Sequence, residues 1–136
     1  MLPRFIITCQ VFLLCLIALK PCNAELTLKK GDRICLVGNA LCERLQHNNQ
    51  WEALLYQRFP EHDLVIRNLG FPGDEPFERI RSENFGDPDQ HLSHSEASVI
   101  LLFFGYNESF ADESGLNQFK EDLIRLIEET QTKDYG

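Results

Sequence analysis

The stretch Arg33–Leu45, RICLVGNALCERL, decides the fold, because an apolar run stops at a glycine and continues directly as a helical pattern. Consecutive apolar residues are typical of a strand buried on both faces, as the central strands of parallel sheets are. Leucines and aromatic residues then recur at helical spacing over Ala40–Phe59, with a break predicted at His47–Gln50 and an end at Pro60. The stretch therefore predicts a strand followed at once by a helix.

Two more apolar runs extend this pattern along the chain. DLVIRNLG and ASVILLFFG each have the length and composition of a buried strand. We expect three parallel strands side by side, with the first in the middle and right-handed crossovers between them. Their expected bounds are Ile34–Val37, Leu64–Arg67 and Val99–Phe104.

Two helical segments complete the predicted architecture. The polar segment Phe77–Ser95 has little periodicity and is predicted to be a loop with a short helix over Asp87–Leu92. Residues 115–130, GLNQFKEDLIRLIEET, form a clear amphipathic pattern. The apolar face of that helix comprises Leu116, Phe119, Leu123, Leu126 and Ile127. Strands that alternate with helices predict an α/β domain with a parallel sheet.

Length and composition limit the chain to one globular domain, with 136 residues of which 43% are hydrophobic and 25% charged. Its first 24 residues have a basic Arg4, an apolar stretch and small residues ending at Ala24, the order typical of a secretory signal peptide. A membrane anchor requires about 20 apolar residues, and this stretch is shorter. A lipoprotein anchor on Cys22 is a weaker alternative. We therefore expect residues 25–136 to be exported, as a periplasmic or secreted domain.

The charge of the chain argues against polyanionic partners. The expected signal segment carries two of the 13 basic side chains and none of the 21 acidic ones, so its removal changes the formal net charge from −8 to −10. Nucleic acid and anionic membrane surfaces are therefore not expected as partners.

The remaining cysteines and the histidines suggest no metal site. We interpret Cys35 and Cys42 as small buried apolar residues, with a disulfide as the alternative. The histidines are scattered, and their one near pair, His91 and His94, is predicted to lie on the surface. We expect neither a metal nor another cofactor.

The loops after the three strands carry ordered motifs, at the sheet edge where ligands bind in open α/β sheets. The first loop is GNA at residues 38–40. The second contains Asn68, Gly70, Gly73 and Asp74, and the third contains Gly105 and Asn107. In this order the motifs resemble those of the SGNH hydrolase (GDSL-type esterase) superfamily, which are Gly-Asp-Ser, Asn-x-Gly-x-x-Gly-Asp and Gly-x-Asn. The chain also resembles the SGNH domains of exported multidomain proteins of planctomycete-type bacteria.

The resemblance implies a flavodoxin-like three-layer sandwich with about five strands in the order 2-1-3-4-5. This chain accounts for about three of them, so residues 25–136 are expected to be a partial SGNH domain. The free side of the third strand would then be an exposed apolar edge where two more strands pair. A longer multidomain protein and a truncated gene product both account for this.

The first motif departs from the family at its functional positions, because Gly-Asp-Ser is replaced by Gly38, Asn39 and Ala40. In the family the serine attacks an ester carbonyl, and the histidine of an Asp-x-x-His motif accepts its proton. Ala40 has no hydroxyl, no histidine follows Asn107, and Glu108 stands where the family has aspartate. No catalytic residue of the family is therefore intact.

The resemblance implies that three donors of the family's oxyanion hole remain. They are the backbone N–H groups of Ala40 and Gly73 and the side-chain amide of Asn107, which would bind a carbonyl oxygen. The alternative is that Gly73 permits a turn and Asn107 satisfies loop backbone groups.

Two functions follow from these departures. The first is an exported SGNH-type hydrolase domain, whose family hydrolyses esters of acyl or acetylated carbohydrate substrates, inactive or truncated in this chain. The second is a noncatalytic module that binds an acyl or sugar ester, or another protein. A flavodoxin-like nucleotide binder is less favoured, because neither glycine-rich phosphate motif follows the first strand.

Overall fold

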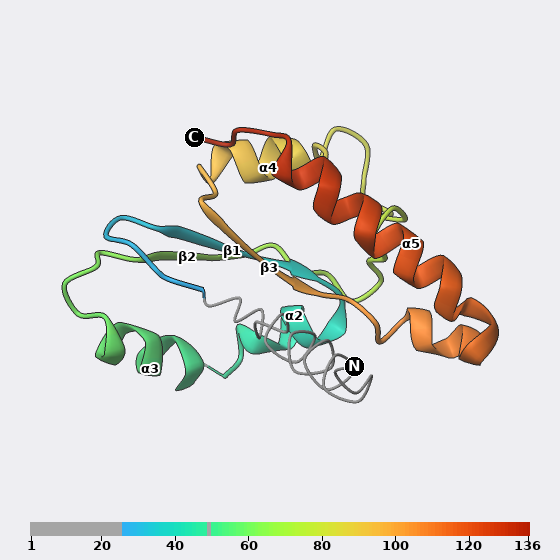
Figure 1. Ribbon diagram of the computed structural model, residues 1–136, viewed down its shortest axis with the longest axis horizontal. Helices are drawn as coiled ribbons and strands as arrows, with labels where there is room; N and C mark the ends of the chain where they lie inside the picture. The colour runs from blue at the N-terminus through green and yellow to red at the C-terminus, as the bar shows by residue number, and fades with distance from the viewer. Residues whose placement is uncertain (1–25, 49) are drawn as a thin grey trace, which may run out of the picture.

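The computed structural model describes residues 26–48 and 50–136, which form an α/β arrangement around one small parallel sheet (Figure 1). The expected signal peptide, residues 1–24, lies outside the described residues. Among the described residues, no helix has both the length and the apolar character needed to cross a membrane.

The sheet has the predicted order and direction. β1 (Arg33–Gly38) lies between β2 (Val65–Asn68) and β3 (Val99–Phe103), and both pairings are parallel. Ile34 is in register with Ile66 on one side and with Val99 on the other. The expected strands are therefore confirmed to within one residue at each end, as is the central position of the first.

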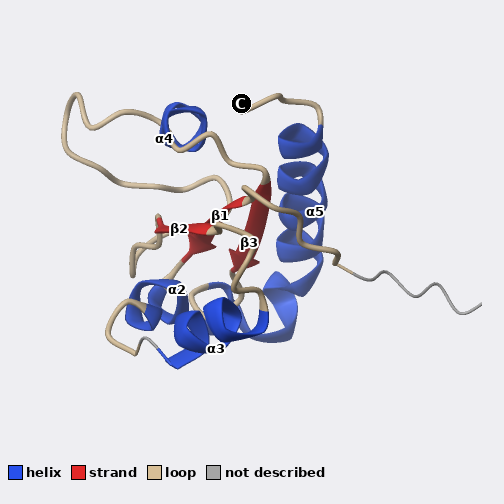
Figure 2. Ribbon diagram, turned by 90° about the vertical axis from the view of Figure 1, so that its left-hand side faces the viewer, coloured by secondary structure: helices blue, strands red, loops and turns tan. Residues whose placement is uncertain are grey.

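Helices cover both faces of this sheet in three layers (Figures 1 and 2). α2 (Ala40–Leu45) and α3 (Gln50–Arg58) lie on one face, and the predicted break at His47–Gln50 separates them. α4 (Pro88–His94) and α5 (Asp112–Gln131) lie on the other face. A 3₁₀ turn, η1 (Glu108–Ala111), leads into α5, which therefore begins three residues before the predicted helix.

Each face has its own apolar core, because consecutive side chains of β1 point to opposite sides of the sheet. Ile34 and Leu36 pack with Cys42 of α2, while Cys35 and Val37 pack with Leu92 of α4. Both cysteines are buried free thiols, which confirms their interpretation as small apolar residues.

The outer side of β3 is an edge of the sheet within the described residues, and α5 covers it incompletely. All five residues of β3 are only half-buried, and no residue of α5 is fully buried. On the face of α5 that was predicted to be apolar, Leu116 and Ile127 remain 46% and 37% exposed. The apolar face of an amphipathic helix is completely buried only where the sheet beneath it is wide enough to cover that face.

Candidate functional site

The three predicted loops meet at the carboxyl end of the sheet. The backbone N–H of Asn39 donates to the carbonyl of Phe103 (3.1 Å), which joins the first loop to the third strand. The N–H of Phe71 donates to the carbonyl of Gly38 (3.0 Å), which joins the second loop to the first. A Cβ at Gly38 would overlap the Phe103 carbonyl, with its carbon only 2.6 Å away, so the strands approach this closely only because position 38 is glycine.

Asn68 fastens the second loop to α2. Its amide nitrogen donates to the carbonyl of Cys42 (2.7 Å), and its amide oxygen accepts from the N–H of Gly70 (2.9 Å) and from the Cys42 thiol (3.4 Å). A Cβ at Gly70 would lie 2.5 Å from Cys42 Sγ, so glycine is needed here for close packing. These two motif residues therefore hold the second loop in shape against α2.

The residues of the expected oxyanion hole are placed as follows. Ala40 begins α2 directly after the first loop, and Gly73 is exposed in the second. The side chain of Asn107 reaches this second loop, where its amide nitrogen donates to the carbonyls of Pro72 (3.0 Å) and Asp74 (3.2 Å), on either side of Gly73. Both amide hydrogens of Asn107 thus have partners in loop carbonyls. This arrangement agrees with the alternative in which Asn107 satisfies loop backbone groups rather than binding a ligand.

Asn39 and Glu108 form a polar pair beneath the loops. Asn39 is 1% exposed, and its amide nitrogen donates to Glu108 Oε2 (3.3 Å), which also accepts from the N–H of Gly105 (2.7 Å). The remaining oxygens of the pair, Asn39 Oδ1 and Glu108 Oε1, are buried without a donor among the described residues. Asn39 precedes α2 but makes no capping bond to it, since its side chain turns toward the third loop.

Asp74, the last residue of the second motif, has a structural partner. It is 2% exposed, and its two oxygens accept from the two terminal nitrogens of Arg81, each at 2.6 Å. The guanidinium of Arg81 also lies 4.1 Å from the centre of the Phe71 ring. This two-point ion pair neutralises Asp74, so its carboxylate is not free to orient a catalytic base.

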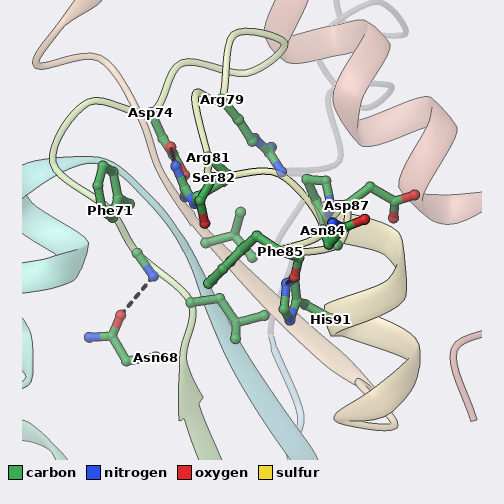
Figure 3. Close-up of a pocket in the computed structure, with 15 residues that line it drawn as sticks. Asn68, Phe71, Asp74, Arg79, Arg81, Ser82, Asn84, Phe85, Asp87 and His91 are labelled. Carbon is green, nitrogen blue, oxygen red and sulfur yellow. Dashed lines mark hydrogen bonds and ion pairs between the residues drawn. The ribbon is translucent and has the colours of Figure 1, made fainter.

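A cavity of about 500 Å³ adjoins the second loop on the α4 side of the sheet (Figure 3). Val37, Leu69 and Phe85 contribute apolar walls, and the long loop from β2 to α4 encloses it. The polar residues of its lining are Asn68, Asp74, Arg79, Arg81, Ser82, Asn84, Asp87 and His91. This volume and this mixture of apolar walls with a few polar groups are typical of small-molecule sites.

Ser82, Asp87 and His91 of this lining are the residue types of a hydrolytic triad, but they are not hydrogen-bonded as one. His91 Nε2 lies 3.0 Å from the Phe85 carbonyl, which only accepts, so this nitrogen carries the proton. Asp87 caps α4, where its Oδ1 accepts from the N–H of Gln90 (2.8 Å). Within the described residues the cavity thus contains no paired nucleophile and base.

The sequence motifs did not identify the residues that line most of this cavity. His91 was expected at the surface, yet it is half-buried against the cavity, whereas His94 is exposed. Arg79 and Arg81 lie in a segment without periodicity. The sequence feature that could have indicated them is a pair of arginines at alternate positions, in a chain with few basic residues.

The two thiols are poorly suited to act as nucleophiles. Burial raises the pKa of Cys42 to about 12, and burial also raises the pKa of Cys35, so both are inert as nucleophiles at neutral pH. No three metal-ligating side chains gather within residues 26–48 and 50–136.

No protein-family model, curated protein or solved structure matches the chain.

Proposed function

We propose that this chain is a noncatalytic ligand-binding domain of SGNH type, in which the hydrolase site has lost its chemistry. The observation that carries the proposal is the cavity of about 500 Å³ beside the motif loops, lined by described residues that form no nucleophile–base pair. The absence of a hydroxyl at Ala40 and of any histidine after Asn107 supports it. The ligand is of the acyl or sugar ester class, or an acyl product derived from such an ester.

The predicted signal segment is compatible with the same proposal, because an exported binding domain would meet its ligand outside the cytoplasm. The acidic charge of the domain suits a small-molecule ligand better than a polyanion.

Ester hydrolysis tests the proposal directly. We expect the purified chain to hydrolyse short-chain aryl esters no faster than a control protein of equal concentration. In serine hydrolases, loss of a triad member leaves only a residual ~10³- to 10⁴-fold acceleration over water. Ala40→Ser alone should not restore activity, because the new hydroxyl would have no base beside it.

Clear turnover by the unmodified chain would overturn the proposal, and three variants would then locate the chemistry. Loss of that turnover in both Ser82→Ala and His91→Ala would identify a hydrolase that uses the cavity. Turnover that persists in both, and in Asn107→Ala, would exclude the cavity and the SGNH loop cluster alike.

A further inference from the structure

Arg79 is the one cavity-lining guanidinium without a carboxylate partner among the described residues. Its Nε and Nη2 donate to the carbonyls of Glu75 (3.4 Å) and Pro76 (3.1 Å), and its Nη1 has no partner among those residues. The guanidinium lies 5.6 Å from the centre of the Phe104 ring. Two backbone carbonyls and an aromatic ring thus hold a positive charge in place without neutralising it.

The neighbouring charges do not satisfy Arg79 either. Arg81 enters the cavity wall from the same loop, and it already occupies both oxygens of Asp74 (Figure 3). Asp87 is exposed and is engaged at the start of α4. Burial is the main cause that lowers the pKa of Arg79; the charge of Asp74 acts in the opposite direction, as those of Asp89 and Tyr135 do, while the charge of Arg81 adds to the lowering. An anion bound directly beside Arg79 would offset the effects of burial and of Arg81.

The rest of the lining suits an apolar body. Val37 and Leu69 belong to the buried side of the sheet, and Phe85 lies against His91 with ring centres 4.9 Å apart. Since this His91 nitrogen donates to the Phe85 carbonyl, the aromatic wall is held in position by a hydrogen bond.

We infer that the cavity binds an amphiphilic anion, with a carboxylate or phosphate group on Arg79 and a short alkyl or aryl body against Val37, Leu69 and Phe85. This inference rests on the proposed binding function. It narrows the expected ligand class from esters in general to carboxylic or phosphoric acids that are ionised at neutral pH. A guanidinium with a free edge is well suited to such a head group. Ala40 does not line this cavity, so the inferred ligand does not involve it.

Titration calorimetry of the purified full chain tests this inference with three probes of equal chain length, which are octanoate, octyl phosphate and neutral octanamide. We expect at least one of the anions to bind about tenfold or more tightly than the amide, because only the anions form a charge-assisted bond with Arg79. The preferred anion identifies the head group as carboxylate or phosphate.

Two cavity variants and one matched control attribute the binding to Arg79. Arg79→Gln should weaken anion binding by about tenfold to 100-fold and leave amide binding unchanged. Ser82→Glu, at an exposed position of the lining, should weaken it too by adding a competing carboxylate. Arg44→Gln removes the same charge from α2, on the opposite face of the sheet, and should change nothing. Circular dichroism checks that each variant is folded.

Three results would overturn the inference. They are no binding of any probe, equal binding of octanoate, octyl phosphate and octanamide, and equal effects of Arg79→Gln and Arg44→Gln. Equal binding of the three probes would contradict the anion site but would still agree with the proposed ligand-binding function. Ester turnover, in contrast, would end the proposed noncatalytic function while leaving the anion site intact.

Discussion

At the scale of single residues, Asn39 and Glu108 explain how the altered first motif remains compatible with the fold. The side chain at position 39 is buried and faces the Glu108 carboxylate at 3.3 Å. An amide can donate to that carboxylate, whereas an aspartate at the same place would put two negative charges together. Asparagine at position 39 and glutamate at position 108 therefore suit one another physically.

Asn39→Asp should lower the free energy of unfolding by about 3 kcal/mol at pH 7, because it replaces a donor with a buried like charge. Repulsion raises the pKa of one carboxyl in the folded state above its unfolded value. The loss is therefore largest above that folded pKa and shrinks as the pH falls and the pair takes up a proton. Urea denaturation of the variant and the parent at pH 7 and pH 5 measures this.

Asn117→Asp is the matched control, since Asn117 is exposed on α5 and the change should cost almost nothing. A deficit for Asn39→Asp that is the same at both pH values would contradict the assignment of a close charge pair.

At the scale of elements, the end of the chain ties α5 to α4. Tyr135 is 8% exposed in the core beside Leu92, and its hydroxyl donates to Asp89 Oδ1 (2.9 Å). Lys133 also pairs with Asp89, and this bond to Lys133 is the main cause that lowers the pKa of Asp89. Lys133 and Tyr135 thus connect the segment after α5 to α4.

Tyr135 makes the stability of this connection depend on alkaline pH. Burial, followed by the bond to Asp89, raises the pKa of Tyr135 to about 12, from 10 in the unfolded chain. The group favours the folded state fully below pH 10, and we expect this contribution to be lost as the pH rises toward 12. Absorbance titration should show one of the three tyrosines ionising later than the other two.

Tyr135→Phe should remove that late ionisation and lower the free energy of unfolding at pH 7 by about 1 kcal/mol, the typical value of one buried hydrogen bond. Tyr106→Phe is the control, because Tyr106 is 58% exposed and makes no such bond. If all three phenols titrate together in the parent, the proposed link between α5 and α4 is wrong.

At the scale of the whole molecule, β2 and β3 are the two edges of the sheet within the described residues. β1 is paired on both sides and its apolar side chains are buried, whereas β2 and β3 are each paired on one side and contain no fully buried residue. Such an edge favours association with a further strand.

Export of the whole chain is tested by intact-mass measurement of the protein recovered outside the cytoplasm. We expect the mass of residues 25–136, because small residues ending at Ala24 follow the apolar stretch. Ala24→Arg should block cleavage and yield the longer mass. An exported parent chain that still begins at Met1 would contradict the cleavage prediction.

The sequence by itself determined the strands, their order, both core cysteines and the place where the loops meet. Short apolar runs and helical periodicity are local properties, and a parallel α/β pattern has few arrangements. Only the tertiary structure decided the polar partners. Asp74 pairs with Arg81, and the amide hydrogens of Asn107 bond to carbonyls of the second loop. Arg79 lines a cavity and pairs with no carboxylate in the part of the chain that the structure describes. These pairings depend on distances between side chains in loops whose sequence has no periodicity. The packing of the loops against the folded sheet fixes those distances, so the sequence pattern alone does not predict them.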